Sequence, residues 1–274
     1  MSIQPPSVLL MGASGSGKTY SLSTLLEAGL EVFLYVTEPH GLETLLDVVQ
    51  HKKLPLEKLH WRYIAPARPG FETQENLAKL ISTSNQAALA NLPPTQRSDA
   101  AFIQLLKSFN NFKDEKDGKD YGPANTFGPD RAIVVDSLSG ISSMAMDVTI
   151  GDKVTASPGE WGIAMRALDK FILTCTSDLK CFFVLTAHVE REVDENAGTS
   201  KLMASTLGKK LAPSIPKYFS EVVLADTETT GDARKHFWST NTPNVVLKNR
   251  ALPIGTKLEP SFKPIVDAFK ARLA

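Results

Sequence analysis

The stretch LLMGASGSGKTYSL, residues 9–22, contains a complete G-x-x-x-x-G-K-[ST] pattern between Gly12 and Thr19. An apolar run at 7–11 precedes the pattern, and a helical pattern at 18–28 follows it. Glycines let the backbone wrap so that several N–H groups face one anion, and the helix N-terminus adds partial positive charge. A chance glycine-rich turn is the alternative, but the flanks favour a phosphate-binding loop. Its predicted residues are Gly12, Ala13, Ser14, Gly15, Ser16, Gly17, Lys18, Thr19 and Tyr20.

Two side chains of this loop, and one carboxylate far from it, have predicted roles in binding ATP and Mg²⁺. Lys18 can reach the β- and γ-phosphates, and the Thr19 hydroxyl can ligate Mg²⁺. Asp136 ends the apolar run AIVVD, at the edge of an open α/β sheet where ligands bind. A carboxylate there can hold the Mg²⁺ through water. The alternative for Asp136 is that it caps a helix beginning in DSLSG.

Two more polar residues end apolar strands. Glu38 follows VFLYVT and could polarise the water that attacks the γ-phosphate, or be an ordinary solvated carboxylate. His188 follows FFVLTA and could sense the γ-phosphate and move the loop after it, or be a structural histidine. Position in the sequence leaves both alternatives open.

Apolar runs alternate with helical patterns along most of the chain. This alternation predicts an α/β fold with a mostly parallel sheet covered by helices on both faces. The predicted strands are 7–11, 30–38, 59–67, 131–140, 180–188, 220–226, 235–240 and 244–250. The last two are expected to pair antiparallel through a turn at 241–243, at the edge of the sheet. The predicted helices outside 70–128 are 18–28, 41–51, 138–148, 160–177 and 261–272.

The segment 70–128 differs from the rest of the chain. A helical pattern at 75–92 breaks at Pro93-Pro94, and a second helical pattern covers 98–112. The charged, glycine-rich stretch 113–130 then reads as an exposed loop. We predict one ATPase domain over 1–274, with 70–128 as a partly mobile insertion.

The composition and the sequence pattern argue against several classes of protein. With 30 basic and 30 acidic residues the formal net charge is zero, so an overall basic nucleic-acid-binding chain is excluded. No run of 18 apolar residues predicts a membrane span, and the first residues do not resemble a signal peptide. Cys175 and Cys181 lack metal-binding spacing and are expected to be reduced thiols. A cytoplasmic protein is therefore expected.

Four segments together resemble the RecA-type recombinase core, over about 7–66 and 130–255. GASGSGKT resembles its Walker A motif, and AIVVDSLSG resembles its Walker B motif, which contains Asp136. FLYVTEPHGLETL resembles the strand with the catalytic glutamate, which implies that Glu38 activates water. FFVLTAHVERE resembles the strand that carries a polar switch residue, usually glutamine, and places His188 there.

A fifth match, NVVLKNRALP, resembles a RecA segment with a basic pair that crosses to the ATP of the neighbouring subunit. The resemblance implies that Lys248 and Arg250 act in trans on the γ-phosphate, and that the chain self-associates into a ring or filament. A solvated edge strand is the alternative reading of this pair. The reduced core is similar to phage-encoded RecA-like proteins of recombination and single-strand annealing. That implies single-stranded DNA and a single-strand-binding protein as partners, in the cytoplasm of a bacterial host.

The same comparison implies two DNA-facing loops, at about 150–160 and 189–209. Candidate phosphate contacts are Lys153, Arg191, Lys201, Lys209 and Lys210. The second loop also holds four acidic residues and no aromatic residue for base stacking, so a solvated flexible loop is its alternative.

Three other functions remain open from sequence. One is a different P-loop DNA motor, a helicase or packaging ATPase. Another is a small-molecule kinase, which would need an arginine-rich lid, whereas the insertion contains only Arg97. The third is a nucleotide-gated adaptor that uses 70–128 as its partner surface and binds ATP without appreciable hydrolysis.

Overall fold

A seven-stranded sheet forms the centre of the computed structural model, which describes residues 3–66, 70–84, 89, 100–151, 153–194, 199–231 and 233–273. The strand order is β11-β10-β1-β7-β6-β2-β3, and every neighbouring pair is parallel except β10 and β11. The predicted fold class, a mostly parallel sheet with an antiparallel edge, is confirmed. The strands are β1 Ser7–Gly12, β2 Glu31–Val36, β3 Leu59–Tyr63, β6 Arg131–Asp136, β7 Phe182–Ala187, β10 Glu221–Thr230 and β11 Ala233–Ser239.

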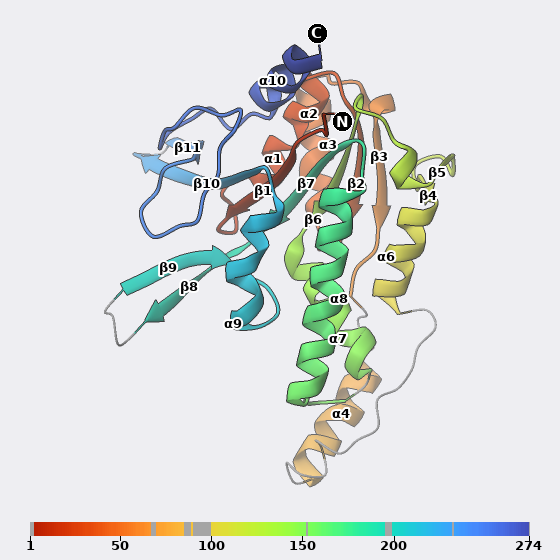
Figure 1. Ribbon diagram of the computed structural model, residues 1–274. Coiled ribbons are helices and arrows are strands. Elements are labelled where there is room, and N and C mark those ends of the chain that lie inside the picture. Colours follow the sequence, from red (N-terminus) through yellow and green to blue (C-terminus); the bar gives the residue numbers. More distant parts are fainter. Residues whose placement is uncertain are drawn as a thin grey trace.

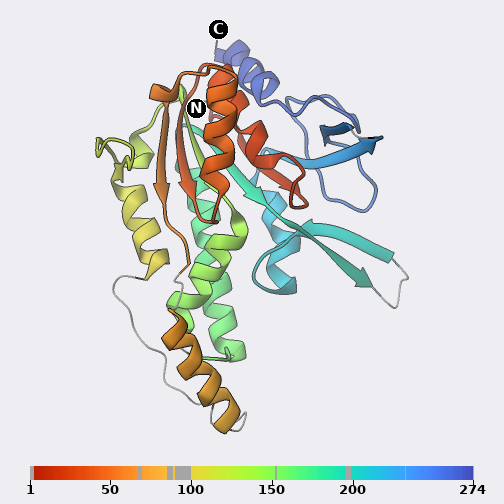
Figure 2. The same cartoon turned by 180° about the vertical axis from the view of Figure 1, so that it is seen from behind.

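Helices cover both faces of the sheet (Figures 1 and 2). Successive strand residues point to opposite faces, so Leu9 joins one buried cluster and Leu10 the other. Burial on both faces explains why the strands read as continuous apolar runs. One face packs against α1 Lys18–Ser21, α2 Ser23–Glu27, α3 Gly41–His51 and α10 Lys263–Leu273. The other packs against α6 Ala101–Asn110, α7 Leu138–Ile150 and α8 Pro158–Ser177.

The predicted polar loop at 189–209 is wrong for most of its length. Strands β8, Val189–Asp194, and β9, Thr199–Ala204, form an antiparallel hairpin that projects from the sheet (Figure 1). Cross-strand backbone pairing holds this charged segment together, for example Glu192 opposite Lys201. The short helix α9, Gly208–Leu211, and the 3₁₀ segment η3, Ala212–Tyr218, return the chain to the sheet.

The predicted pairing at the C-terminal edge is also wrong. The antiparallel partner of β11 is β10, from Leu224 opposite Ser239 to Thr230 opposite Ala233. Segment 244–250 forms only isolated bridges, one of them between Val222 and Lys248. Strand β10 continues beyond the predicted end at 226, and β11 pairs with its polar end as far as Thr230.

The second half of the predicted insertion belongs to the core. Strand β4, Phe112–Lys113, begins at the last residue of the predicted helix 98–112, and the stretch 113–130, predicted as an exposed loop, contains β5 Asp120–Gly122 and the 3₁₀ segment η2 Ala124–Thr126. Phe112 and Phe127 are fully buried against Phe33, and buried Asp114 accepts a hydrogen bond from His60 at 2.8 Å. The first half supplies the exposed helix α4, Phe71–Thr83. The rest of the predicted helix at 75–92 and the Pro93-Pro94 break lie outside the described residues, except Leu89.

Because Phe112 packs in the core, we expect its replacement to lower the stability of the protein strongly. The substitution Phe112→Ala should lower the free energy of unfolding by about 3–5 kcal/mol, because it removes a fully buried ring. Denaturant unfolding measures the change, and Phe71→Ala is the control because Phe71 is 90% exposed. Equal stability of the two variants would contradict the assignment of this segment to the core.

None of the described helices is long and apolar enough to cross a membrane.

Candidate nucleotide-binding site

The loop between β1 and α1 has the backbone shape of an anion cradle. Gly15 and Gly17 have positive φ values of 74° and 87°, which side chains rarely tolerate. At Gly12 a Cβ atom would lie 2.5 Å from the carbonyl oxygen of Ala225, so β10 leaves no room for a side chain there. The glycine spacing read from the sequence therefore has a steric reason at each of these three positions.

Lys18 points back across the loop. Its Nζ donates hydrogen bonds to the carbonyl oxygens of Gly12 at 2.8 Å and Ala13 at 2.9 Å. Burial lowers the pKa of the Lys18 ammonium, while the nearby carboxylates of Asp136 and Glu38 oppose that shift. A triphosphate in the cradle would give this buried cation the counter-charge that it lacks in the loop itself.

Thr19 and Asp136 meet although 117 residues separate them. The Thr19 hydroxyl donates to Asp136 Oδ2 at 2.8 Å, and the Thr186 hydroxyl of β7 donates to Asp136 Oδ1 at 2.5 Å. Strands β1, β7 and β6 are parallel neighbours, so their carboxyl ends share one sheet edge. Burial raises the pKa of the Asp136 carboxyl, because it disfavours the ionised form, and a cation beside the carboxylate would oppose that shift.

The oxygen donors of Thr19 and Asp136 fit Mg²⁺, which is held by few protein ligands plus water and phosphate oxygens. Among the described residues, no group of three or more His, Cys, Asp or Glu side chains could hold a metal ion.

Glu38 lies beside this pair because Val36, at the end of β2, is in register with Asp136. The Ser137 hydroxyl donates to Glu38 Oε1, and His188 Nε2 lies 3.2 Å from Glu38 Oε2. The hydrogen bond from His188 lowers the pKa of Glu38, with a smaller effect from Ser137. The sequence indicates only that Glu38 and His188 each end a strand, whereas the structure shows that the two side chains are in contact.

These residues line a cavity of about 470 Å³ at the mouth of the loop. It also contains two side chains that sequence reasoning missed, Arg234 and His236 of β11. The ring of Tyr20 stacks on His236, with centroids 6.2 Å apart and planes at 22°. The alternating pair R-x-H was visible in the sequence, but its place beside the loop depends on how β11 pairs.

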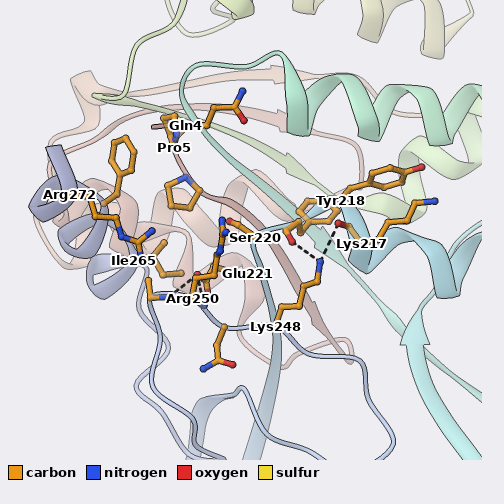
Figure 3. Close-up of a pocket in the computed structure, with 15 residues that line it drawn as sticks. Gln4, Pro5, Lys217, Tyr218, Ser220, Glu221, Lys248, Arg250, Ile265 and Arg272 are labelled. Atoms are coloured by element: carbon orange, nitrogen blue, oxygen red, sulfur yellow. Dashed lines mark hydrogen bonds between the residues drawn. The ribbon is translucent and has the colours of Figure 1, made fainter. Parts of the chain in front are cut away.

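Lys248 and Arg250 lie at the other end of β1, in a separate pocket of about 670 Å³ (Figure 3). Lys248 Nζ donates to the carbonyl oxygens of Pro216, Lys217 and Phe219 at 2.9, 3.2 and 3.1 Å. The backbone N–H of Arg250 donates to the Glu221 carboxylate. The structure does not bring this pair to the phosphate loop of its own chain, so a role in trans stays a prediction.

The predicted DNA-contacting residues are scattered. Lys153 forms a 2.7 Å ion pair with Glu160, and its side chain is only 8% exposed. Arg191 and Lys201 lie on the β8–β9 hairpin, and Lys210 is exposed in α9. The side chain of Lys209 lies outside the described residues. The pairing of Lys153 removes its charge from the surface, whereas exposed Arg191 and Lys201 remain available on the hairpin.

The sequence matches no protein-family model and no curated protein. The solved structures that are similar to this chain include the following two. One is a KaiC-like protein from the hyperthermophilic archaeon Pyrococcus horikoshii, with 14% identity, a TM-score of 0.39, and coverage of 86% of this chain and 79% of that one. The other is the RadB recombinase, with 14% identity, a TM-score of 0.38, and coverage of 88% and 84%.

Proposed function

We propose that this chain is a Mg²⁺-dependent, RecA-like ATPase. The observation that carries the proposal is the 2.8 Å contact between Thr19 and Asp136, beside a glycine cradle that holds a buried lysine. Lys18 would bind the β- and γ-phosphates, and Thr19 with Asp136 would hold Mg²⁺. Bound Mg²⁺ would shield the phosphate charges.

Glu38 would orient the attacking water. Its carboxylate lies in the same cavity as Lys18 and Asp136. The lowered pKa keeps Glu38 ionised at neutral pH, so it can accept a hydrogen bond from water. His188 and Ser137 hold one carboxylate oxygen each, which restricts the rotation of the group.

We further propose that the ATPase self-associates and acts on single-stranded DNA in recombination or annealing, together with a single-strand-binding protein. His188 contacts Glu38 and directly precedes β8, so a change at Glu38 can alter the position of the hairpin that carries Arg191 and Lys201. Self-association would let the pocket of Lys248 and Arg250 face the phosphate loop of a neighbouring subunit. The resemblance to RecA-like phage proteins supports this more specific role.

Single-stranded DNA should raise the ATPase rate, and ATP should increase light scattering. The reason is that both the hairpin and the subunit interface are expected to respond to the nucleotide through His188 and the trans pair. Phosphate release with and without oligonucleotide measures the first effect, with Lys18→Ala protein as the control for contaminating activity. An unchanged rate together with unchanged scattering would contradict the DNA-dependent function.

A nucleotide-gated adaptor is the second candidate, because α4 exposes apolar side chains. Phe71 is 90% exposed and Ile81 is 48% exposed, although both are large apolar residues. An adaptor would bind ATP in the same cavity without appreciable hydrolysis, so the ATPase measurement separates the two functions.

A further inference from the structure

One face of β11 lies against the phosphate loop of its own chain. Arg234, His236 and Trp238 alternate along the strand and therefore share a face. Trp238 is fully buried and packs edge-on against Phe262 at 4.8 Å, which anchors that face to the core. Trp238 pairs with Ala225 of β10, which in turn lies beside Gly12 at the end of β1. His236 and Arg234 lie further along the same face of β11, beyond that end of β1, where the loop begins.

The two side chains reach successive glycines of the cradle. A Cβ atom built on Gly15 would lie 3.1 Å from Arg234 Nη2, and one built on Gly17 would lie 2.8 Å from His236 Nδ1. Both side chains line the cavity that contains Lys18 and Glu38. Any phosphate group held by the loop therefore lies beside the β11 face.

The polar atoms of this face have no partners among the residues that the structure describes. Within that part of the chain, the Arg234 guanidinium has neither a hydrogen bond nor an ion pair. His236 Nδ1 is buried without a hydrogen-bond partner. A buried, unpartnered polar atom is costly unless a ligand or water completes it.

We propose that Arg234 binds the phosphates of the nucleotide in cis and that His236 helps to position them. A guanidinium presents several donors in one plane and matches phosphate oxygens better than an ammonium does. The inference rests on the proposed ATP site and adds a second cation to the cavity that Lys18 lines, supplied by the same chain. Arg234 would act on the nucleotide of its own chain, unlike Lys248 and Arg250, which lie at the other end of β1 and are predicted to act in trans.

Calorimetric titration with a non-hydrolysable ATP analogue tests this inference. The substitution Arg234→Ala should weaken binding about tenfold or more, because a charge-assisted hydrogen bond contributes about 1.5–3 kcal/mol. Arg234→Lys should restore part of the affinity. Lys235→Ala is the matched control, since it removes the same charge from the next residue, on the opposite face of β11, and it should bind as the wild type does.

A subunit-mixing experiment distinguishes cis from trans action. Lys18→Ala protein supplies Arg234 but no functional cradle, and Arg234→Ala protein supplies the cradle without the arginine. If Arg234 acts in cis, adding the Lys18→Ala protein leaves the weakened binding of Arg234→Ala protein unchanged. Recovery of binding on mixing would overturn the cis assignment.

The wild-type titration separates this inference from the proposed function. If the wild type fails to bind the ATP analogue, the proposed ATPase function is refuted. If the wild type binds and Arg234→Ala protein binds equally tightly, only the role of Arg234 is refuted. Thermal unfolding of each variant checks that exposed Arg234 does not contribute to the fold itself.

Discussion

Replacing Lys18 with alanine is expected to abolish measurable ATP binding. The Lys18 side chain is buried at the loop and lines the cavity, where its ammonium would face the β- and γ-phosphates. Truncating one partner of such a buried charge pair costs about 3 kcal/mol or more. That corresponds to at least about a 100-fold loss of affinity. Calorimetry or a fluorescent ATP analogue measures the change.

The control for this variant is Lys58→Ala. Lys58 also donates from Nζ to a backbone carbonyl oxygen, that of Gly29 at 3.3 Å, but it lies just before β3, at the end of the sheet away from the cradle. It should bind ATP as the wild type does. Removal of the buried Lys18 charge should not unfold the protein, since its desolvation already opposes folding. Retained affinity in folded Lys18→Ala protein would refute the nucleotide site.

Replacing Glu38 with glutamine is expected to retain ATP binding and remove hydrolysis. The amide has the same shape and can still accept the Ser137 hydrogen bond, so the cavity should keep its form. It cannot supply the negative charge that polarises the attacking water. Loss of a positioned general base lowers rates by about 10²–10⁴-fold. Phosphate release under single-turnover conditions, alongside a binding titration, measures both parts of the prediction.

Glu43→Gln is the matched control for Glu38→Gln. Glu43 is also a carboxylate paired with a histidine, His40, at 2.7 Å, but it is exposed on α3 and does not line the cavity. Its substitution should leave turnover unchanged. Turnover at the wild-type rate by Glu38→Gln protein would remove Glu38 from the mechanism, while leaving the binding roles of Lys18 and Thr19 intact.

Residues at the ends of buried strands were predictable for a physical reason. Parallel strands between helices are apolar along their length, so a polar residue such as Asp136 or Glu38 at the end of one stands out. Carboxyl ends of neighbouring parallel strands share an edge, which is why the structure brings Thr19, Asp136 and Glu38 together. The order of the strands, with β7 between β1 and β6, could not be read from the same pattern.

The structure of two charged segments could not be predicted, because it depends on contacts that the local sequence does not contain. The β8–β9 hairpin and the stretch around Phe112 have a loop-like composition, and their order comes from contacts with distant parts of the chain. Phe112 is buried because Phe33 of β2 lies beside it, 79 positions earlier in the numbering. Local composition contains no information about such a partner.

The sequence by itself determined the glycine cradle of the proposed nucleotide site, since its glycines, lysine and threonine lie within eight consecutive residues and its shape is a matter of local backbone geometry. It also determined the class of sheet that presents the cradle, through uninterrupted apolar strands. Only the tertiary structure decided which side chains from elsewhere surround the cradle. The pairing of β11 with β10 places Arg234 and His236 there, and the path of 244–250 places Lys248 and Arg250 at the opposite end of β1. Strand pairing depends on contacts between residues far apart in the chain, and these form only when the whole core packs.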